Sequence, residues 1–216
     1  MNGKDLELLK KQHYNNYRNS VKDIVLNNTT ILVDEDMMSL FKKPPLDSMD
    51  VLKVKIIEIS KRYKLLVNTE MLEKKLDCYR KSFSSLCENI KKNRIQHFYH
   101  IIDQSSTELI KINKKDFIPI NKEIKKSIKN VIQESFEKNI LEGISSLFKE
   151  DISEELSDKI IVDCRNHFKK YFKQLLENID IKLMVKDTIL INACKEQNDR
   201  YLFTLNNSRL LNDDIN

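Results

Sequence analysis

The chain has 216 residues, of which 40% are hydrophobic and 33% charged, and it carries a formal net charge of +5. It contains two glycines, Gly3 and Gly143, where average usage predicts about fifteen. The glycine-rich loops that wrap phosphate groups in nucleotide-binding enzymes therefore cannot be built here. The net charge is the small excess of 38 basic over 33 acidic side chains, so it predicts at most a weak contact with DNA.

Chain-breaking residues are scarce throughout the sequence. Besides the two glycines there are three prolines, Pro44, Pro45 and Pro119. A chain with so few breakers and so many charges suits long amphipathic helices, each with one buried and one solvated face. We therefore expect a mainly α protein, built as an elongated helical bundle.

The first forty residues predict two helices separated by a break. Apolar residues at helical spacing run from about residue 4 to 26, and a polar break covers residues 27–36. A short helical piece at 37–41 then ends before Pro44 and Pro45, because the residue before a proline is disfavoured in a helix.

The longest helix is expected in the next segment. Asp47 or Ser48 caps a helix that runs to about residue 66, and Thr69 caps a longer one from 70 to about 103. Apolar residues of this longer helix alternate at spacings of four and three, as in helices packed nearly parallel. This seam consists of Leu72, Leu76, Tyr79, Phe83, Leu86 and Ile90. At 1.5 Å per residue the helix is about 50 Å long, more than a compact bundle covers, so we predict that the seam is partly a protein interface.

A basic patch follows the seam on the same helix. Lys91, Lys92 and Arg94 form the tightest group of positive charges there, although Arg94 falls on the line of the seam. Such a run is typical of a solvated face, and the alternative is a contact with an acidic partner or a nucleic acid.

Residues 104–121 are expected to form a polar connection that contains Pro119, with an extended piece at 117–120. Helical spacing returns over residues 122–148, and Gly143 is expected to interrupt it. Asp151, followed three residues later by Glu154, resembles a capping box at the start of a last helix that reaches residue 178.

After residue 178 the apolar period changes to two. Ile179, Ile181, Leu183 and Val185 alternate with polar or long side chains, which is the spacing of a strand. We therefore expect a helical domain at 1–178 and a small β-rich module at 179–216. A module of under about forty residues is too small to be stable alone, so it should lean on the helices or on a partner.

Few residues suggest a chemical site. Cys164 and His167 are three residues apart, and so are His97 and His100, but neither pair has a second pair at metal-ligand spacing. No nucleophile motif, zinc-protease motif or phosphate loop is present. The sequence thus predicts a protein without catalytic activity, bound metal or cofactor.

Location is predicted from what the sequence lacks. It has no apolar signal core at its start and no apolar stretch long enough to span a membrane, so we expect a soluble intracellular protein without a membrane contact. In that reducing environment the four cysteines, Cys78, Cys87, Cys164 and Cys194, are expected to be buried free thiols.

Three segments together are similar to the GINS family, whose four related subunits accompany the MCM ring in the replicative DNA helicase. The segment from Leu72 to Asp103, with its late Lys-Lys-x-Arg run, resembles that family's long central helix. The stretch from Ile152 through Leu156 to Leu176 resembles its last helix, and the β-prone part from Ile189 to Phe203 lies where a small β domain belongs. The sequence departs from the family in the short β part and in a larger insertion at about 111–150.

The resemblance implies a nuclear, non-catalytic scaffold whose partners are GINS-like subunits and the MCM helicase ring. Two alternatives stay open. One is a coiled-coil-like scaffold subunit of another complex, of the kinetochore or tethering type. The other is a basic helical protein that binds nucleic acid, for which a steep salt dependence is expected.

Overall fold

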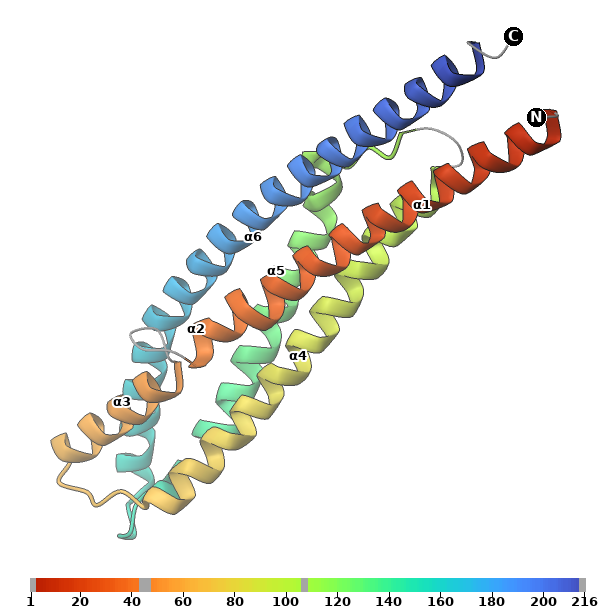
Figure 1. Ribbon diagram of the computed structural model, residues 1–216. Helices are drawn as coiled ribbons and strands as arrows, with labels where there is room; N and C mark the ends of the chain where they lie inside the picture. Colours follow the sequence, from red (N-terminus) through yellow and green to blue (C-terminus); the bar gives the residue numbers. More distant parts are fainter. Residues whose placement is uncertain (1–2, 43–47, 106–108, 214–216) are drawn as a thin grey trace. The chain divides into compact units, whose positions relative to one another are not determined.

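The computed structural model describes residues 3–42, 48–105 and 109–213, and every regular element within these ranges is a helix (Figure 1). In chain order the elements are α1 (Gly3–Thr30), the π-helix η1 (Ile31–Met37), α2 (Met38–Lys42), α3 (Ser48–Arg62), α4 (Thr69–Gln104), α5 (Lys114–Phe136), the π-helix η2 (Glu137–Leu141), the 3-10 helix η3 (Ile144–Leu147) and α6 (Glu154–Asp213). The chain is thus mainly helical. Pro44, Pro45 and Asp47, which were expected to end one helix and cap the next, lie outside the described residues.

The predicted β-rich module at 179–216 is wrong. Its described residues, 179–213, continue α6 as one uninterrupted helix, and the described part of the chain contains no strand. The fold class is therefore helical to the end of the described chain. In the described residues, β-type backbone pairing is limited to an isolated antiparallel bridge between Val67 and Phe148.

Burial along α6 explains why the alternating pattern misled. Ile179 and Leu183 are buried, whereas Ile181 and Val185 are 53% and 45% exposed. The first pair lies on the core face of the helix and the second pair on its outward side. A helix that is apolar on two faces reads as alternation over a few residues, although its buried positions are spaced by four.

Two shorter predictions are also corrected. The polar break at 27–36 is helical, because Asn28 and Thr29 are buried and the Asn28 amide donates a hydrogen bond to the carbonyl of Lys186 at 3.0 Å. The extended piece at 117–120 belongs to α5, with Pro119 inside the helix. There, buried Phe117 and Ile120 supply core contacts that outweigh the backbone hydrogen bond that a proline removes.

The boundaries of α4 agree with the prediction to within one residue at each end. Its cap is Asn68 rather than Thr69, since the Asn68 side chain accepts a hydrogen bond from the Met71 backbone at 3.2 Å. The predicted interruption at Gly143 is confirmed: its φ is +63°, a left-handed conformation that favours glycine. The start of α6 is capped by the Ser153 hydroxyl, not by Asp151.

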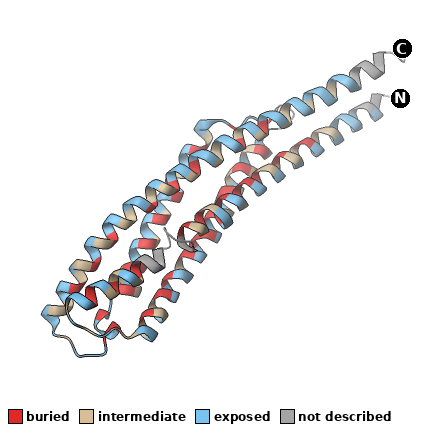
Figure 2. Ribbon diagram, turned by 60° about the vertical axis from the view of Figure 1, so that its left-hand side comes forward, coloured by how far each residue is buried: buried red, intermediate tan, exposed pale blue. Residues whose placement is uncertain are grey.

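The chain divides into two compact units. Unit 1 comprises Met1–Leu32, Lys91–Asn121 and Leu183–Asn216, and unit 2 comprises Val33–Ile90 and Lys122–Lys182. Helices α4 and α6 contribute to both units. Figure 2 shows buried positions in red recurring along the helices, as amphipathic helices require.

Unit 1 is held together by polar groups as well as apolar ones. The Tyr17 hydroxyl donates to the Asn198 side chain at 2.5 Å and accepts from the backbone of Ile110 at 2.8 Å. The Asn198 amide completes the triangle by donating to the Ile110 carbonyl at 3.0 Å. The ring of Tyr17 also stacks on Tyr201 with centroids 4.2 Å apart. These contacts tie α1 and α6 to the segment that precedes α5.

Unit 2 has the larger apolar core, with side chains from α3, α4, α5 and α6. Its aromatic centre is the stacked pair Phe136 and Phe168, whose ring centroids are 3.7 Å apart. At one end, backbone hydrogen bonds join Asn68 to Leu147 at 2.7 Å and Lys149 to Leu66 at 2.9 Å. These bonds fasten the connection between α3 and α4 to the short helix η3.

Candidate functional site

The predicted interface seam of α4 lies in the core of unit 2. All six side chains are at most 5% exposed: Leu72, Leu76, Tyr79, Phe83, Leu86 and Ile90. Their cover comes from this chain's own residues, so the seam is not an open surface of the described chain. A partner contact at these residues stays a prediction. Because the seam is buried, the exposed residues of the chain are the candidates for a partner surface.

The predicted basic patch is not one surface. Lys92 is exposed and Lys91 is half-buried, whereas the Arg94 side chain has no exposed surface at all. Arg94 therefore cannot reach an acidic partner or a nucleic acid without leaving the core. Of the three residues, Lys92 is the exposed one.

Arg94 is instead the centre of a buried polar cluster in unit 1. Its guanidinium donates to the Asp187 carboxylate of α6 at 2.7 Å and to the Asn121 side chain at 3.3 Å. The Asn121 amide in turn donates to the other Asp187 oxygen at 2.6 Å. The rings of Phe98 and Phe117 lie 5.3 and 5.4 Å from the guanidinium carbon, within the range of cation–π attraction.

The electrostatics of this cluster are those of a structural ion pair. Burial lowers the pKa of Arg94, and the carboxylate of Asp187 acts in the opposite direction. The Arg94 Nε is buried without a hydrogen-bond partner, so the guanidinium is not fully satisfied. A buried ion pair of this kind fixes how its helices align, because any slip leaves a charge unpaired in the core. The sequence signal was the placement of Arg94 on the seam, but its partner lies 93 residues away.

The candidate partner surface is the outward side of α6 in unit 1. We call it the α6 outer face and define it by Met184, Val185, Thr188 and Ile189. Met184, Val185 and Ile189 are 64%, 45% and 48% exposed, and Thr188 is exposed as well. At 100° per residue these four positions span an arc of about 140°, the width of a stripe that normally packs on another element. Figure 2 shows exposed positions in pale blue running along this helix.

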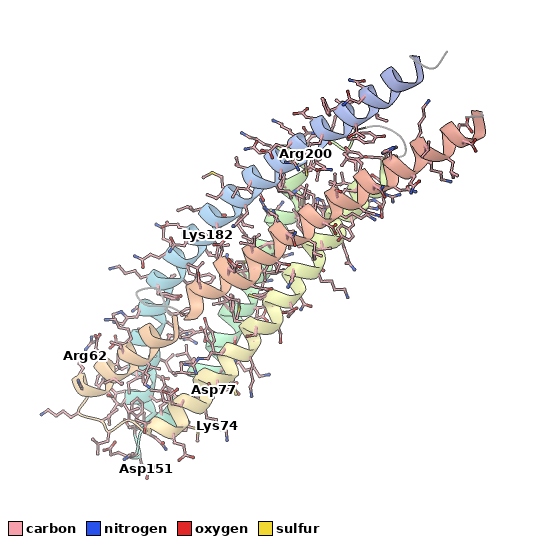
Figure 3. All side chains as sticks on the ribbon, in the orientation of Figure 1. Arg62, Lys74, Asp77, Asp151, Lys182 and Arg200 are labelled. Atoms are coloured by element: carbon pink, nitrogen blue, oxygen red, sulfur yellow. The ribbon has the colours of Figure 1, made fainter. Side chains whose placement is uncertain are left out.

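The α6 outer face carries no charged residue. The Thr188 hydroxyl donates to the carbonyl of Met184 at 2.9 Å, so its donor is used within the helix and its methyl group is left outward. The charged residues within this stretch are turned elsewhere: Asp187 pairs with Arg94, and Lys186 is half-buried. Lys182, labelled in Figure 3, lies two residues before the face and is 3.5 Å from Asp36. In a chain with 33% charged residues, this group of neighbouring exposed apolar side chains is a candidate contact site.

The histidines considered for a metal site have other contacts. His97 donates from Nε2 to the backbone oxygen of Asp116 at 2.7 Å, and His100 accepts from the Gln104 amide at 2.9 Å. The nearby carboxylate of Asp103 is held by Lys22 and Arg18, whose hydrogen bonds lower its pKa. Across the described ranges, no three His, Cys, Asp or Glu side chains come together as a metal site requires.

Thiol reactivity separates Cys78 from the other three cysteines. The prediction that all four thiols are buried is wrong for Cys78, which is exposed. Cys87, Cys164 and Cys194 are buried, and burial raises the pKa of Cys164 and Cys194 to about 12. We expect a thiol reagent at pH 8 to modify one cysteine quickly and the rest after unfolding, and Cys78→Ser to remove the fast phase. Fast modification of two or more thiols in the folded chain contradicts this burial.

Burial of Cys164 and Cys194 also makes the free energy of unfolding depend on pH. Since the unfolded thiols ionise near pH 9, the contribution of these two buried thiols is complete below that pH and falls as pH rises through it.

Comparisons with known proteins give no match that bears on the resemblance to the GINS family. No protein-family model matches the chain, and no curated protein or solved structure is significantly similar to it. Of the three segments that carry the GINS resemblance, the first two are helical, but residues 189–203 lie within α6 and not in a β domain. Within the described residues, no helix has the length and apolar character needed to cross a bilayer.

Proposed function

We propose that this chain is a non-catalytic scaffold subunit of a protein complex, and that it packs a helix of a partner protein along the α6 outer face. The observation that carries the proposal is the second apolar stripe of α6, at Met184, Val185 and Ile189, opposite the buried stripe that includes Leu183 and Leu190. An apolar stripe on a helix normally packs against another element, and unit 1 covers one of the two stripes of α6.

The partner element is best described as an amphipathic helix. The face spans about two turns and consists of positions i, i+1, i+4 and i+5, which match the side-chain spacing of a helix packed alongside. It lacks the unpaired backbone donors and acceptors that an added β-strand would need. A partner with a leucine- or isoleucine-rich stripe fits this chemistry.

The assembly itself is proposed at two levels. A GINS-like subunit of the replicative helicase assembly is the specific form, supported by the helical segments at 72–103 and 152–176. A scaffold of the kinetochore or tethering type is the alternative, and the α6 outer face fits both. Nucleic-acid binding is less well supported, because Arg94 is withdrawn from the basic patch into the core.

The test replaces two residues of the face and compares the native complexes. Val185→Lys combined with Ile189→Lys places charges in the proposed contact, which weakens partner binding by about a hundredfold or more. Folding is preserved, since exposed substitutions change stability by about 0.5 kcal/mol or less. Val162→Lys is the matched control, because Val162 lies on the same helix and is 53% exposed.

Tagged chains from native cells are compared by gel filtration and mass spectrometry. The wild type and Val162→Lys are expected in one stoichiometric complex, and the double variant as the free chain. A double variant that stays in a complex of unchanged mass contradicts the proposal, and so does a wild type that migrates alone.

A further inference from the structure

Unit 2 contains a cavity of about 300 Å³ between α3, the end of α5 with η2, and α6. Its deeper walls are apolar and include Ile56, Ile140 and the stacked rings of Phe136 and Phe168. Exposed Lys170 and Gln174 are among its lining residues, so the cavity opens to solvent. It falls at the lower end of the range that small-molecule sites occupy, about 300–1,000 Å³.

The size of the cavity limits the ligand. Because a water molecule takes up about 30 Å³ in the liquid, the space holds about ten non-hydrogen atoms. The apolar walls select a hydrocarbon body over a polar one. Burial raises the pKa of the Cys164 thiol to about 12, so this wall residue stays protonated and takes the part of an apolar group rather than of a nucleophile.

The charged side chains that line the cavity are basic. They are Lys55 and Lys170, beside the polar side chains of His167, Tyr171 and Gln174, and no Asp or Glu is among the lining residues. Lys55 shares its charge with Glu58, which is 2.5 Å away on the same helix. Lys170 is exposed on α6, three residues after His167. The lysine ammonium groups beside apolar walls complement a molecule with one anionic end.

We propose that this cavity binds a small apolar molecule with a single carboxylate, of the medium-chain fatty-acid class. The hydrocarbon lies against Phe136, Phe168 and Ile140, and the carboxylate is held at the rim by Lys170 and His167. Octanoate has the size that the volume allows. The cavity belongs to unit 2 and the α6 outer face to unit 1, so either proposal can fail without the other.

The experiment titrates the full chain with sodium octanoate below its micelle concentration and uses octylamine as the cation of matched length. We expect saturable binding of one octanoate per chain by calorimetry, with NMR contacts between its methylenes and the rings of Phe136 or Phe168. Octylamine is expected to bind at least about tenfold more weakly, since its charge is repelled at the rim.

Two variants locate the anionic end. Lys170→Glu should weaken octanoate binding about tenfold or more, whereas Lys169→Glu, the same charge change on the next exposed residue, should leave it nearly unchanged. Both side chains are exposed, so circular dichroism should show the same helix content in each variant. The proposal is overturned by the absence of saturable octanoate binding, by equal affinity for octylamine, or by equal weakening in the two variants.

Discussion

Asp187→Asn is expected to lower the free energy of unfolding by about 3–5 kcal/mol. The Arg94 side chain has no exposed surface and Asp187 is 14% exposed, so the substitution leaves a guanidinium in the core without its counter-charge. An asparagine keeps one side-chain oxygen, so one of the two donors that bind the carboxylate, Arg94 at 2.7 Å or Asn121 at 2.6 Å, also loses its acceptor. Urea denaturation followed by circular dichroism measures the loss.

Asp180→Asn is the matched control on the same helix. Asp180 pairs with Lys125 at 2.8 Å, but its side chain is 48% exposed, and exposed pairs contribute about 1 kcal/mol or less. The double variant Arg94→Met with Asp187→Leu removes both charges and should recover much of the loss, since a buried ion pair can often be replaced by apolar groups. Similar losses for the two aspartates contradict the structural role of the cluster.

Leu183→Ala should destabilise the chain by about 2–5 kcal/mol, whereas Val185→Ala should cost about 0.5 kcal/mol. Leu183 is 2% exposed and Val185 is 45% exposed, because two residues along a helix point about 200° apart. In a strand the same two residues share one face, and their truncation has similar costs. The pair of variants therefore distinguishes the helix from the strand that the alternating pattern predicted.

Circular dichroism in native buffer is the control for both variants, because each keeps the same helix content if the fold persists. Ile181→Ala supplies a second exposed position, at 53%, and should behave like Val185→Ala. Equal losses at Leu183 and Val185 are inconsistent with α6 as described.

Much of the helical fold could be predicted from local pattern. In α4 a capping side chain, a regular seam and the absence of breakers all agree, and the predicted boundaries fall within one residue of those observed. The interruption of the helix at Gly143 could also be predicted. The chain has only two glycines, so a glycine within a helical segment indicates a backbone conformation that other residues rarely adopt.

The end of the chain could not be predicted from spacing alone. Ile179 and Leu183 face the core while Ile181 and Val185 face outward, and over seven residues these two stripes produce the alternation of a strand. The helical period becomes visible over a longer stretch: Leu190 lies seven residues after Leu183, Cys194 lies four residues after Leu190, and both are buried. Val185, one of the two exposed residues that concealed the helix, also belongs to the α6 outer face that we propose as the partner surface.

The candidate sites divide in the same way. Arg94 could be placed on the seam of its helix, but its role depends on Asp187 and Asn121, which no local pattern connects to it. The cavity of unit 2 depends on how α3, α5 and α6 pack, so it had no sequence signal beyond the apolar character of its walls. Contacts between distant segments decide both features.

The proposed partner contact is tested most directly by cysteine accessibility in the native assembly. Val185→Cys and Val162→Cys are each placed in a Cys78→Ser chain, whose remaining thiols are buried. Both engineered thiols should react rapidly with a maleimide in the purified chain, because both positions are exposed in it. In native extract, position 185 is predicted to be protected and position 162 to react as before. Equal, undiminished reaction at both positions in the extract contradicts a partner on the α6 outer face.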